Sequence, residues 1–463
     1  MQRRLSIFNP YSGKQVAAVP LSGPGGMERA LRRAREGRAD QSPDRRVAVL
    51  GRLADLLDDR RDELSRVITS ESGLCLRDTR HEVRRVAEVA RAAALVAQTI
   101  DEDQTSRFVL GAKRRGPKLR VITEPLDLVV GITPFNHPMN QVAHKVLPAV
   151  AAGAPIVVKP SSKTPLSAFA LQRLLVEAGL DESQVQIVVG LSAEKAVDPL
   201  ITSPLVDMVT FTGGTEAGRR IASRLVHSGN TWKRFVPELG GCSSLIVNDD
   251  ADVQRSVETA IKGCFGNSGQ RCTAIRRVIV TRPIHKAFLV ALEAAASKLK
   301  YGDPWDENVH VGTVISERSA RSIQARVNAA LRDGARLLVG NVRQGALYSP
   351  TVLDNVRVTS TLVAQETFGP VAAVIRARDI DHAISLARRT NYALAGAVMT
   401  RSEETARRVS NALVVGQFNW NGIPSYRTEA APFGGFKDSG NGEKEGVILA
   451  AQGMRRIRTF YSH

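Results

Sequence analysis

The chain has 463 residues, 43% of them hydrophobic, and this length exceeds what one hydrophobic core usually supports, so we expect two or three domains. Lysine and arginine number 64 against 46 aspartate and glutamate residues, which gives a formal charge of +18, but the arginines are dispersed and aromatic residues make up only 5%. Nucleic-acid-binding proteins concentrate their charge in a patch with aromatics between, so we interpret this charge as a solvated surface that also attracts anions.

Amphipathic helices are predicted for most of the first hundred residues. Val47, Leu50, Leu53 and Leu57 recur at three- and four-residue spacing, and a similar pattern runs over 79–96. Short β-rich segments follow and alternate with helical stretches, at 126–132, 155–160, 186–190 and 207–211. A second such series begins after about residue 243. This alternation predicts an α/β fold with two open parallel-sheet, Rossmann-like domains.

Two segments belong to neither series. Residues 107–125 are polar and broken by Gly111, Gly116 and Pro117, which predicts a protruding hairpin. The last ten residues alternate weakly, with Ile457 and Tyr461 on one side, as an edge strand would.

The four cysteines predict neither a disulfide framework nor a metal site. Cys75, Cys242, Cys264 and Cys272 are scattered, and no two have the CxxC spacing of a zinc ligand pair. The first twenty residues lack the apolar segment of a secretory signal, and no run of about 18 apolar residues could cross a bilayer. We therefore expect a cytoplasmic protein with no metal, membrane or nucleic-acid partner.

One cysteine stands in a context that suggests chemistry. Cys272 follows Gly269, Gln270 and Arg271, which are not typical core residues, and a guanidinium beside a thiol is expected to lower the thiol pKa. The alternative is a small buried core residue. A nucleophilic thiolate also needs a base and an oxyanion hole; the candidates are Glu238 beside a Gly-Gly turn, the amide of Asn136, and a second acid, Glu366.

Taken together and in order, seven motifs closely resemble the aldehyde dehydrogenase superfamily, over nearly the whole chain. They are TPFNHPMN with Asn136, VVKP ending at Lys159 and Pro160, FTGGTEAG (211–218), ELGG (238–241), GQRCTA (269–274), QETFGP (365–370) and PFGGFKDSGNG (432–442). The resemblance implies the aldehyde dehydrogenase fold: a discontinuous cofactor domain (1–106 and 126–239), a catalytic domain (240–440) and an oligomerisation arm (107–125 and 441–463). In the family such arms pair across subunits, which implies a homodimer or homotetramer.

The same resemblance implies the roles of three residues. Cys272 would attack the aldehyde carbon, and the amide of Asn136 with the Cys272 backbone N–H would hold the oxyanion. Glu238 would activate water to hydrolyse the thioester. Its presence argues against the coenzyme-A-acylating branch of the family.

The implied cofactor is NADP or NAD. Lys159 would bind the adenosine ribose, and NAD-preferring members commonly carry Glu three residues later, where this chain has Ser162. Without that carboxylate the 2′-phosphate is not repelled, so NADP should be tolerated. The cofactor-binding residues implied by the motifs are Thr133, Pro134, Phe135, Lys159, Ser161, Ser162, Lys163, Phe211, Thr212, Gly213, Gly214, Leu239, Gly240, Glu366 and Phe368.

Cationic residues around the predicted nucleophile indicate an anionic substrate. Arg271 precedes Cys272, His137 follows Asn136, Arg427 lies in an entrance loop, and the helix 79–94 offers Arg84 or its neighbour Arg85. This many donors suit a phosphate or phosphonate better than a carboxylate. The alternative is that Arg271 only tunes the thiol and the others are surface residues.

The stretches 133–150 and 425–435 look like those of phosphonoacetaldehyde dehydrogenases and, more loosely, lactaldehyde dehydrogenases. We therefore predict oxidation of phosphonoacetaldehyde or phosphonoformaldehyde to the acid. The alternatives are non-phosphorylating glyceraldehyde-3-phosphate dehydrogenase and lactaldehyde or succinate-semialdehyde dehydrogenase. A different class is a catalytically silent, polyanion-binding relative.

Overall fold

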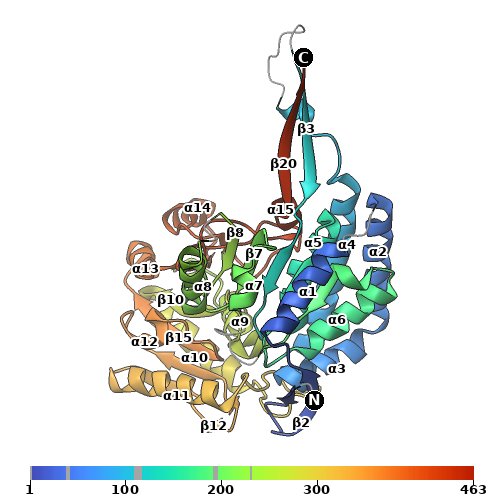
Figure 1. Ribbon diagram of the computed structural model, residues 1–463. Coiled ribbons are helices and arrows are strands. Elements are labelled where there is room, and N and C mark those ends of the chain that lie inside the picture. The colour runs from blue at the N-terminus through green and yellow to red at the C-terminus, as the bar shows by residue number, and fades with distance from the viewer. Residues whose placement is uncertain (1–2, 38–41, 109–116, 191–196, 230–231) are drawn as a thin grey trace.

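The computed structural model describes residues 3–37, 42–108, 117–190, 197–229 and 232–463. Two α/β halves lie side by side, and a two-stranded ribbon projects from between them (Figure 1). Each half is built on one parallel sheet, as the alternation of strands and helices in the sequence predicts.

The first half contains a five-stranded, wholly parallel sheet of order β6-β5-β4-β7-β8. Its strands are short and almost wholly apolar because both faces are covered. They are β4 (Val129–Ile132), β5 (Ile156–Lys159), β6 (Val185–Ile187), β7 (Met208–Thr212) and β8 (Arg234–Glu238).

Successive residues of these strands face opposite cores, as the pleat requires. Val129, Ile156 and Val158 pack into one core with α2 (Pro43–Asp59), α3 (Arg61–Ser72), α4 (Leu76–Thr99), α5 (Pro138–Ala152), α6 (Leu166–Glu177) and α15 (Val447–Gly453). Val130 and Val157 pack into the other with α1 (Pro24–Glu36), α7 (Asp198–Thr202) and α8 (Thr215–His227).

The second half contains a seven-stranded sheet of order β11-β14-β15-β10-β9-β17-β18, parallel except at its β11 edge. The strands are β9 (Ser243–Val247), β10 (Ile275–Thr281), β11 (Arg336–Val339), β14 (Thr351–Asp354), β15 (Val371–Ala377), β17 (Ala395–Met399) and β18 (Gln417–Trp420). One face packs on α9 (Val253–Phe265) and α10 (Arg282–Ser297). The other packs on α11 (Glu317–Arg332), α12 (Thr361–Ala364), α13 (Ile380–Ala387) and α14 (Glu403–Ala412).

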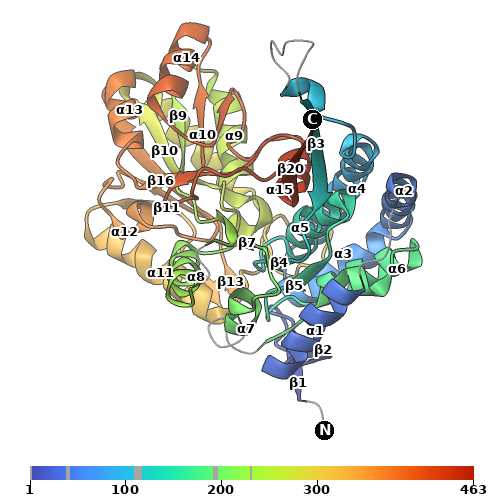
Figure 2. The same cartoon turned by 45° about the horizontal axis from the view of Figure 1, so that its top comes forward.

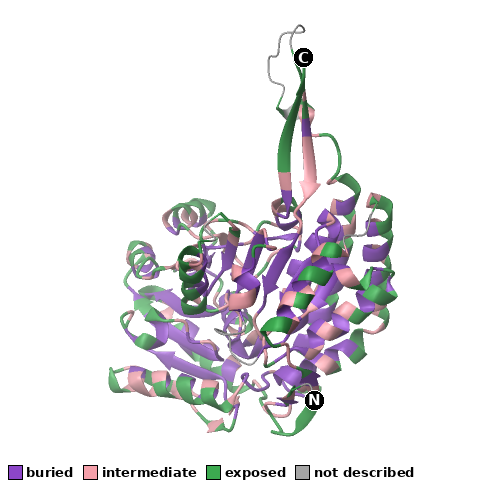
Figure 3. Cartoon of the chain, in the orientation of Figure 1, coloured by how far each residue is buried: buried purple, intermediate pink, exposed green. Residues whose placement is uncertain are grey.

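The projecting ribbon joins β3 (Lys118–Pro125) to β20 (Arg455–Ser462) in an antiparallel pair along the full length of both strands. The partner of β3 is thus the C-terminal strand and not a second strand from 107–125; Gly111 and Gly116 lie outside the described residues. Most of β20 is exposed (Figure 3). Helix α15, which we expected within the arm, packs on α5 at the base of the ribbon (Figure 2).

The remaining described elements are short. They are the antiparallel pairs β1 (Arg4–Phe8) with β2 (Gln15–Pro20), β12 (Arg343–Gln344) with β13 (Leu347–Tyr348) and β16 (Tyr392–Ala393) with β19 (Phe436–Lys437), and the 3₁₀ turns η1 (Thr105–Arg107), η2 (Glu182–Gln184) and η3 (Gly266–Gly269).

This architecture brings the predicted site residues to one seam. Thr133, Lys159 and Glu238 stand at the carboxyl ends of β4, β5 and β8, which share one edge of the five-stranded sheet. Cys272 and Glu366 precede β10 and β15, so they stand at the amino-terminal edge of the seven-stranded sheet. The two edges meet, and Glu238 forms a bridge to Gly440 across the seam.

Candidate active site

Cys272 follows a buried left-handed turn. Asn267, Ser268 and Gly269 have φ angles of 60°, 53° and 68°, a conformation that is costly for the two residues with side chains. A Cβ on Gly269 would lie 2.1 Å from the Gly369 carbonyl oxygen, so only glycine fits there. Asp78 of α4 accepts a hydrogen bond from the Asn267 N–H at 3.0 Å and holds the turn against the first half of the molecule.

Cys272 is half-buried, whereas the other three cysteines are fully buried. Burial raises the pKa of its thiol to about 12, and the carboxylates of Glu366 and Glu238 act in the same direction. The prediction of a lowered thiol pKa is therefore wrong, and the largest opposing effect of a cation comes from Arg427 and not from Arg271. The Arg271 guanidinium instead lies over Gly266, where an added Cβ would be 3.6 Å from its carbon Cζ.

The predicted oxyanion-hole amide lies beside this turn. Asn136 is buried, and its Nδ2 donates one hydrogen bond to the Gln270 carbonyl at 2.8 Å. Its backbone carbonyl accepts from Asn267 Nδ2 at 2.9 Å. Because the amide has two hydrogens, the bond to Gln270 fixes its orientation and leaves one donor for a ligand.

Glu238 is a buried carboxylate without a hydrogen-bond partner. It is 2% exposed, and neither side-chain oxygen is bonded to a described protein group. Burial raises its pKa well above the usual range, and the nearby Glu445 adds to the rise. A Cβ on Gly434, which has a φ of 150°, would approach Glu238 Oε1 to 2.5 Å, so glycine keeps that side of the carboxylate open.

The sequence analysis missed a buried charge network behind Glu238. Lys145 of α5 donates to Glu445 Oε1 at 2.7 Å and to Thr210 Oγ1 at 2.7 Å, and the Thr210 hydroxyl donates to Glu445 Oε1 at 2.6 Å. Lys145 is 0% exposed. The available signal was the pair His144 and Lys145 inside the otherwise apolar stretch 142–152.

The predicted cofactor edge carries buried polar groups that lack partners. Lys159 is 6% exposed, and its ammonium group has only one long bond, 3.4 Å to the Pro160 carbonyl. Burial lowers its pKa. The hydroxyl groups of Thr133 and Thr212 have no hydrogen-bond partner among the described residues. Such groups are costly unless a ligand completes them.

Glycines shape the same edge for close approach. A Cβ on Gly213 would lie 2.5 Å from the ring of Phe211, and one on Gly240 would lie 2.7 Å from Glu366 Oε2. Glu366 accepts from the Gly241 N–H at 3.0 Å. Helix α8 begins next to Gly214 with no side-chain cap, which leaves its first N–H groups for an anion.

The other predicted cofactor residues lie around this edge. The rings of Phe135 and Phe368 meet edge to face at 5.8 Å. Leu239 packs under α8, against Gly218. Pro134, Ser161 and Ser162 are half-buried, and Lys163 is exposed beyond them. The residues present therefore fit a dinucleotide: an ammonium group, hydroxyl donors and a glycine turn before a helix.

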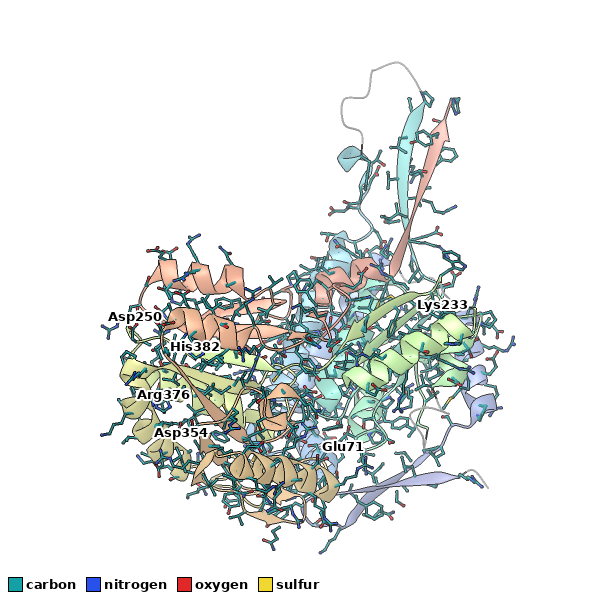
Figure 4. The ribbon with its side chains drawn as sticks, turned by 90° about the vertical axis from the view of Figure 1, so that its left-hand side faces the viewer. Glu71, Lys233, Asp250, Asp354, Arg376 and His382 are labelled. Carbon is teal, nitrogen blue, oxygen red and sulfur yellow. The ribbon has the colours of Figure 1, made fainter. Side chains whose placement is uncertain are left out.

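Glu71 supports this edge from α3. Its carboxylate accepts hydrogen bonds from the N–H groups of Leu166 and Ser167 at the start of α6, which fixes the turn that follows Lys159 (Figure 4). Burial raises its pKa to about 8. Lys233, also labelled in Figure 4, donates to carbonyls at the end of α7.

A cavity of about 1110 Å³ opens beside the thiol. Cys272 and Asn136 line it, and so do all four predicted anion-binding residues, Arg271, His137, Arg427 and Arg84, together with Arg85. The structure thus brings the predicted anion-binding residues to one side of the predicted nucleophile. No cluster of three or more potential metal ligands, and no helix long and apolar enough to cross a membrane, occurs within the described ranges.

The cations of this cavity differ in whether they are paired. Arg85 forms a two-pronged ion pair with Glu429, at 2.6 and 3.1 Å. Arg84 is exposed and contacts His81 Nδ1 at 2.8 Å. In contrast, Arg271 Nε and Arg427 Nη1 are buried and have no partner among the described residues.

Glu429 is a second residue that the sequence analysis missed. Besides Arg85, it contacts His144 Nε2 at 2.7 Å, and it lies 3.9 Å from Arg427 Nη2. Its pKa is held below the usual range by His144 and Arg85, against the effect of burial. The His144 nitrogen that faces Glu429 must carry the proton, so it cannot also accept from Arg427, 3.3 Å away. Arg427, whose guanidinium lies over the Phe433 ring at 4.4 Å, therefore keeps its donors for the cavity.

Comparison with known proteins finds relatives of the chain over nearly its whole length. The model of the aldehyde dehydrogenase family matches residues 1–459. A sulfoacetaldehyde dehydrogenase from Neptuniibacter caesariensis is 34% identical, over 99% of both chains, and a 3-sulfolactaldehyde dehydrogenase from Priestia aryabhattai is 33% identical, over 98% of this chain and 94% of the relative. A solved NADP-dependent glyceraldehyde-3-phosphate dehydrogenase from Bacillus halodurans, complexed with NADP, is 33% identical and superposes with a TM-score of 0.93 over 99% of this chain and 96% of that one. The predicted α/β fold is thereby confirmed.

Proposed function

This chain belongs to the aldehyde dehydrogenase family, whose members are NAD(P)-dependent oxidoreductases, and we propose that its substrate is a short aldehyde with a phosphonate group. Phosphonoacetaldehyde and phosphonoformaldehyde fit this description. The product would be the corresponding carboxylic acid.

The observation that carries this proposal is a pair of buried guanidinium nitrogens in the cavity of Cys272, Nε of Arg271 and Nη1 of Arg427, that have no hydrogen-bond partner among the described residues. A buried Arg271 Nε and a buried Arg427 Nη1 are unfavourable until an anion occupies the cavity. Guanidinium stays protonated, and its planar donors match the oxygens of a tetrahedral anion. His137 and Arg84 add two further nitrogen-bearing groups to the same cavity, more than a single carboxylate needs.

We propose that Cys272, Asn136 and Glu238 perform the chemistry. Glu238 takes the thiol proton, because a desolvated carboxylate with a raised pKa is a stronger base. The sulfur then bonds to the aldehyde carbon, and the carbonyl electrons move to oxygen, where Asn136 and the Cys272 N–H donate to the oxyanion. After Glu238 has released the thiol proton to solvent, water attacks the thioester while Glu238 accepts the water proton. The C–S bond then breaks, the acid leaves, and the proton on Glu238 returns to the sulfur.

A bound NAD(P) would supply the oxidant of this reaction, because its nicotinamide ring can accept a hydride from the substrate carbon. Lys159, Thr212, Gly213, Gly214, Glu366 and the other predicted cofactor residues would hold it. Ser162 leaves no carboxylate near the adenosine ribose, so we propose that NADP is accepted as well as NAD.

A sulfonate-bearing aldehyde is a second candidate. Two relatives at 33 to 34% identity are named for sulfoacetaldehyde and 3-sulfolactaldehyde. A sulfonate is also tetrahedral with three oxygens, but it carries one charge where a phosphonate carries up to two. Glyceraldehyde-3-phosphate and succinate semialdehyde are further candidates, from a solved relative and from a probable succinate-semialdehyde dehydrogenase of Sinorhizobium fredii at 33% identity.

We also propose that the bounds of the cofactor domain, catalytic domain and arm follow the family, and that the ribbon formed by β3 and β20 pairs with another subunit. Ile457, Phe460 and Tyr461 of β20 are 63%, 58% and 56% exposed, which supports burial of this strand in a homodimer or homotetramer.

Initial rates test the proposed substrate. Phosphonoacetaldehyde, sulfoacetaldehyde, glyceraldehyde-3-phosphate, succinate semialdehyde, lactaldehyde and propanal are compared with NAD and with NADP, for the wild type and Arg271→Ala. We expect the phosphonate to have the largest kcat/KM, and the variant to lose about 30-fold on it, roughly 2 kcal/mol of transition-state binding. Equal values for anionic and neutral aldehydes, unaffected by the substitution, would exclude an arginine-lined anion site.

A further inference from the structure

Glu82 of α4 points its charge toward the proposed anion site. Its Oε1 accepts hydrogen bonds from the N–H groups of Met139 and Asn140 at 2.8 and 3.0 Å, which fixes the carboxylate at the first turn of α5. Its Oε2 has no hydrogen-bond partner among the described residues and faces His137 Nδ1 at 3.5 Å. Both side chains are buried, and the His137 ring stands between Glu82 and the cavity that holds Cys272.

This placement creates an electrostatic conflict for an anionic ligand. A substrate anion beside His137 would approach a fixed carboxylate of the same sign. A proton on His137 removes the conflict, because the imidazolium can donate from Nδ1 to Glu82 and from Nε2 to the ligand. His137 lines the cavity, and Nε2 is the second donor of an imidazolium whose Nδ1 faces Glu82, so Nε2 can take this role.

Before the ligand binds, the neighbouring groups favour a neutral ring. Burial lowers the pKa of His137, Arg271 and Arg85 lower it further, and Glu82 alone opposes them. His81, on the same side of the cavity, accepts from Arg84 and is itself neutral, with its pKa lowered to about 4. A bound anion adds the negative charge that Glu82 alone does not supply.

We propose that Glu82 and His137 form a proton-coupled anion receptor: His137 takes up one proton when an anionic aldehyde binds and holds it between Glu82 and the ligand. Glu82 is a positioning residue that acts through His137. This inference rests on the proposed anionic substrate and adds to it a pH-dependent specificity.

The pH dependence of specificity tests the receptor. The probe is sulfoacetaldehyde, because a sulfonate keeps one charge over the whole range, and the reference is propanal. The ratio of their kcat/KM values is measured from pH 5.5 to 9, so that titration of Cys272 and Glu238 cancels. We expect the ratio to fall with rising pH, with a slope that approaches about tenfold per unit above the pKa of free His137.

Two variants separate the receptor from general damage. His137→Asn should flatten the pH dependence of the ratio. Glu82→Gln keeps an oxygen that accepts from Met139 and Asn140 but has no charge, so it should shift the fall of the ratio to lower pH. The matched control is Glu63→Gln on α3, an exposed carboxylate that does not line this cavity, which should behave as the wild type.

Calorimetry measures proton uptake directly. It requires neither catalytic turnover nor a Glu82 variant that folds. Ethanesulfonate is titrated into the wild-type enzyme at pH 8 in two buffers of different ionisation enthalpy, with His137→Asn as the comparison. We expect uptake of about one proton for the wild type and none for the variant. If the enzyme prefers anions equally at every pH and takes up no proton, the proton-coupled receptor is excluded and the proposed function stands. Absence of anion preference at every pH overturns the proposed function itself.

Discussion

The two sides of Cys272 carry buried charges of opposite sign, and in both places key atoms lack partners. On one side Glu238 has two unbonded oxygens, and on the other Arg271 and Arg427 each have an unbonded nitrogen. Burial without a hydrogen-bond partner has different consequences for a carboxylate and for a guanidinium. A carboxylate can escape its cost by taking a proton, so burial makes it a base; a guanidinium cannot lose its proton, so burial makes it a receptor for an anion.

If the carboxylate side performs the chemistry, its variants should have the largest effects. Cys272→Ser replaces the thiol with a much weaker nucleophile and should lower kcat by about a thousandfold or more on every aldehyde. Dehydrogenase rates with NADP measure this loss, and Cys264→Ala, in the core under β10, should keep its rate. Residual activity near the wild-type value would exclude Cys272 as the nucleophile.

Glu238→Gln should lower steady-state kcat by about 10²- to 10³-fold, because it removes the proposed base but keeps the size of the side chain. Rapid mixing distinguishes the steps: a burst of NADPH followed by slow turnover would assign Glu238 to thioester hydrolysis. No burst would assign it to activation of the thiol. A rate unchanged from the wild type would remove Glu238 from the mechanism.

The variant Arg427→Leu tests a residue that acts on both the thiol and the anion site. The thiol pKa of about 12 lies above neutral pH, so alkylation by iodoacetamide should rise about tenfold per pH unit from pH 6 to 9. Removing the cation that opposes the rise should slow alkylation of Cys272 at every pH in this range. It should also lower kcat/KM for anionic aldehydes by about 30-fold, and less for propanal. Faster alkylation would show that Arg427 does not act on the thiol.

Glu429→Gln tests whether the anion side is preorganised. Losing this charge frees Arg85 and leaves it close to Arg427, and the repulsion should disturb the loop that carries Arg427. We expect kcat/KM for an anionic aldehyde to fall about tenfold, with propanal changed less than about twofold. Glu258→Gln, an exposed carboxylate of the same cavity, is the control. A higher rate on the anion would mean that Arg85 joins the receptor once Glu429 is neutral.

The sequence predicted the parts of the molecule that depend on local pattern. Strands β4, β5 and β7 follow from short apolar runs, and the place of Lys159 follows from the apolar run that precedes it. Strand β8, which ends at Glu238, was not among the predicted strands. The network of Lys145, Thr210 and Glu445 could not be predicted, because three distant segments meet only in the folded core. The predicted pKa of Cys272 was wrong in direction for a related reason: neighbours in sequence need not share an environment. The Arg271 guanidinium lies over Gly266, and burial controls the pKa of the thiol.

An effect no larger than that of Glu429→Gln is expected at the far end of the cofactor edge, at the uncharged Ser162. Ser162 is half-buried after Lys159, and Ser162→Glu places a carboxylate where the 2′-phosphate of NADP would lie. We expect KM for NADP to rise about tenfold, or roughly 1.4 kcal/mol, with KM for NAD unchanged or lower. Ser162→Gln has the same size without the charge and should leave the NADP-to-NAD ratio within about threefold of the wild type. If both variants raise both KM values equally, size rather than charge limits this position, and the tolerance of NADP must depend on residues other than Ser162.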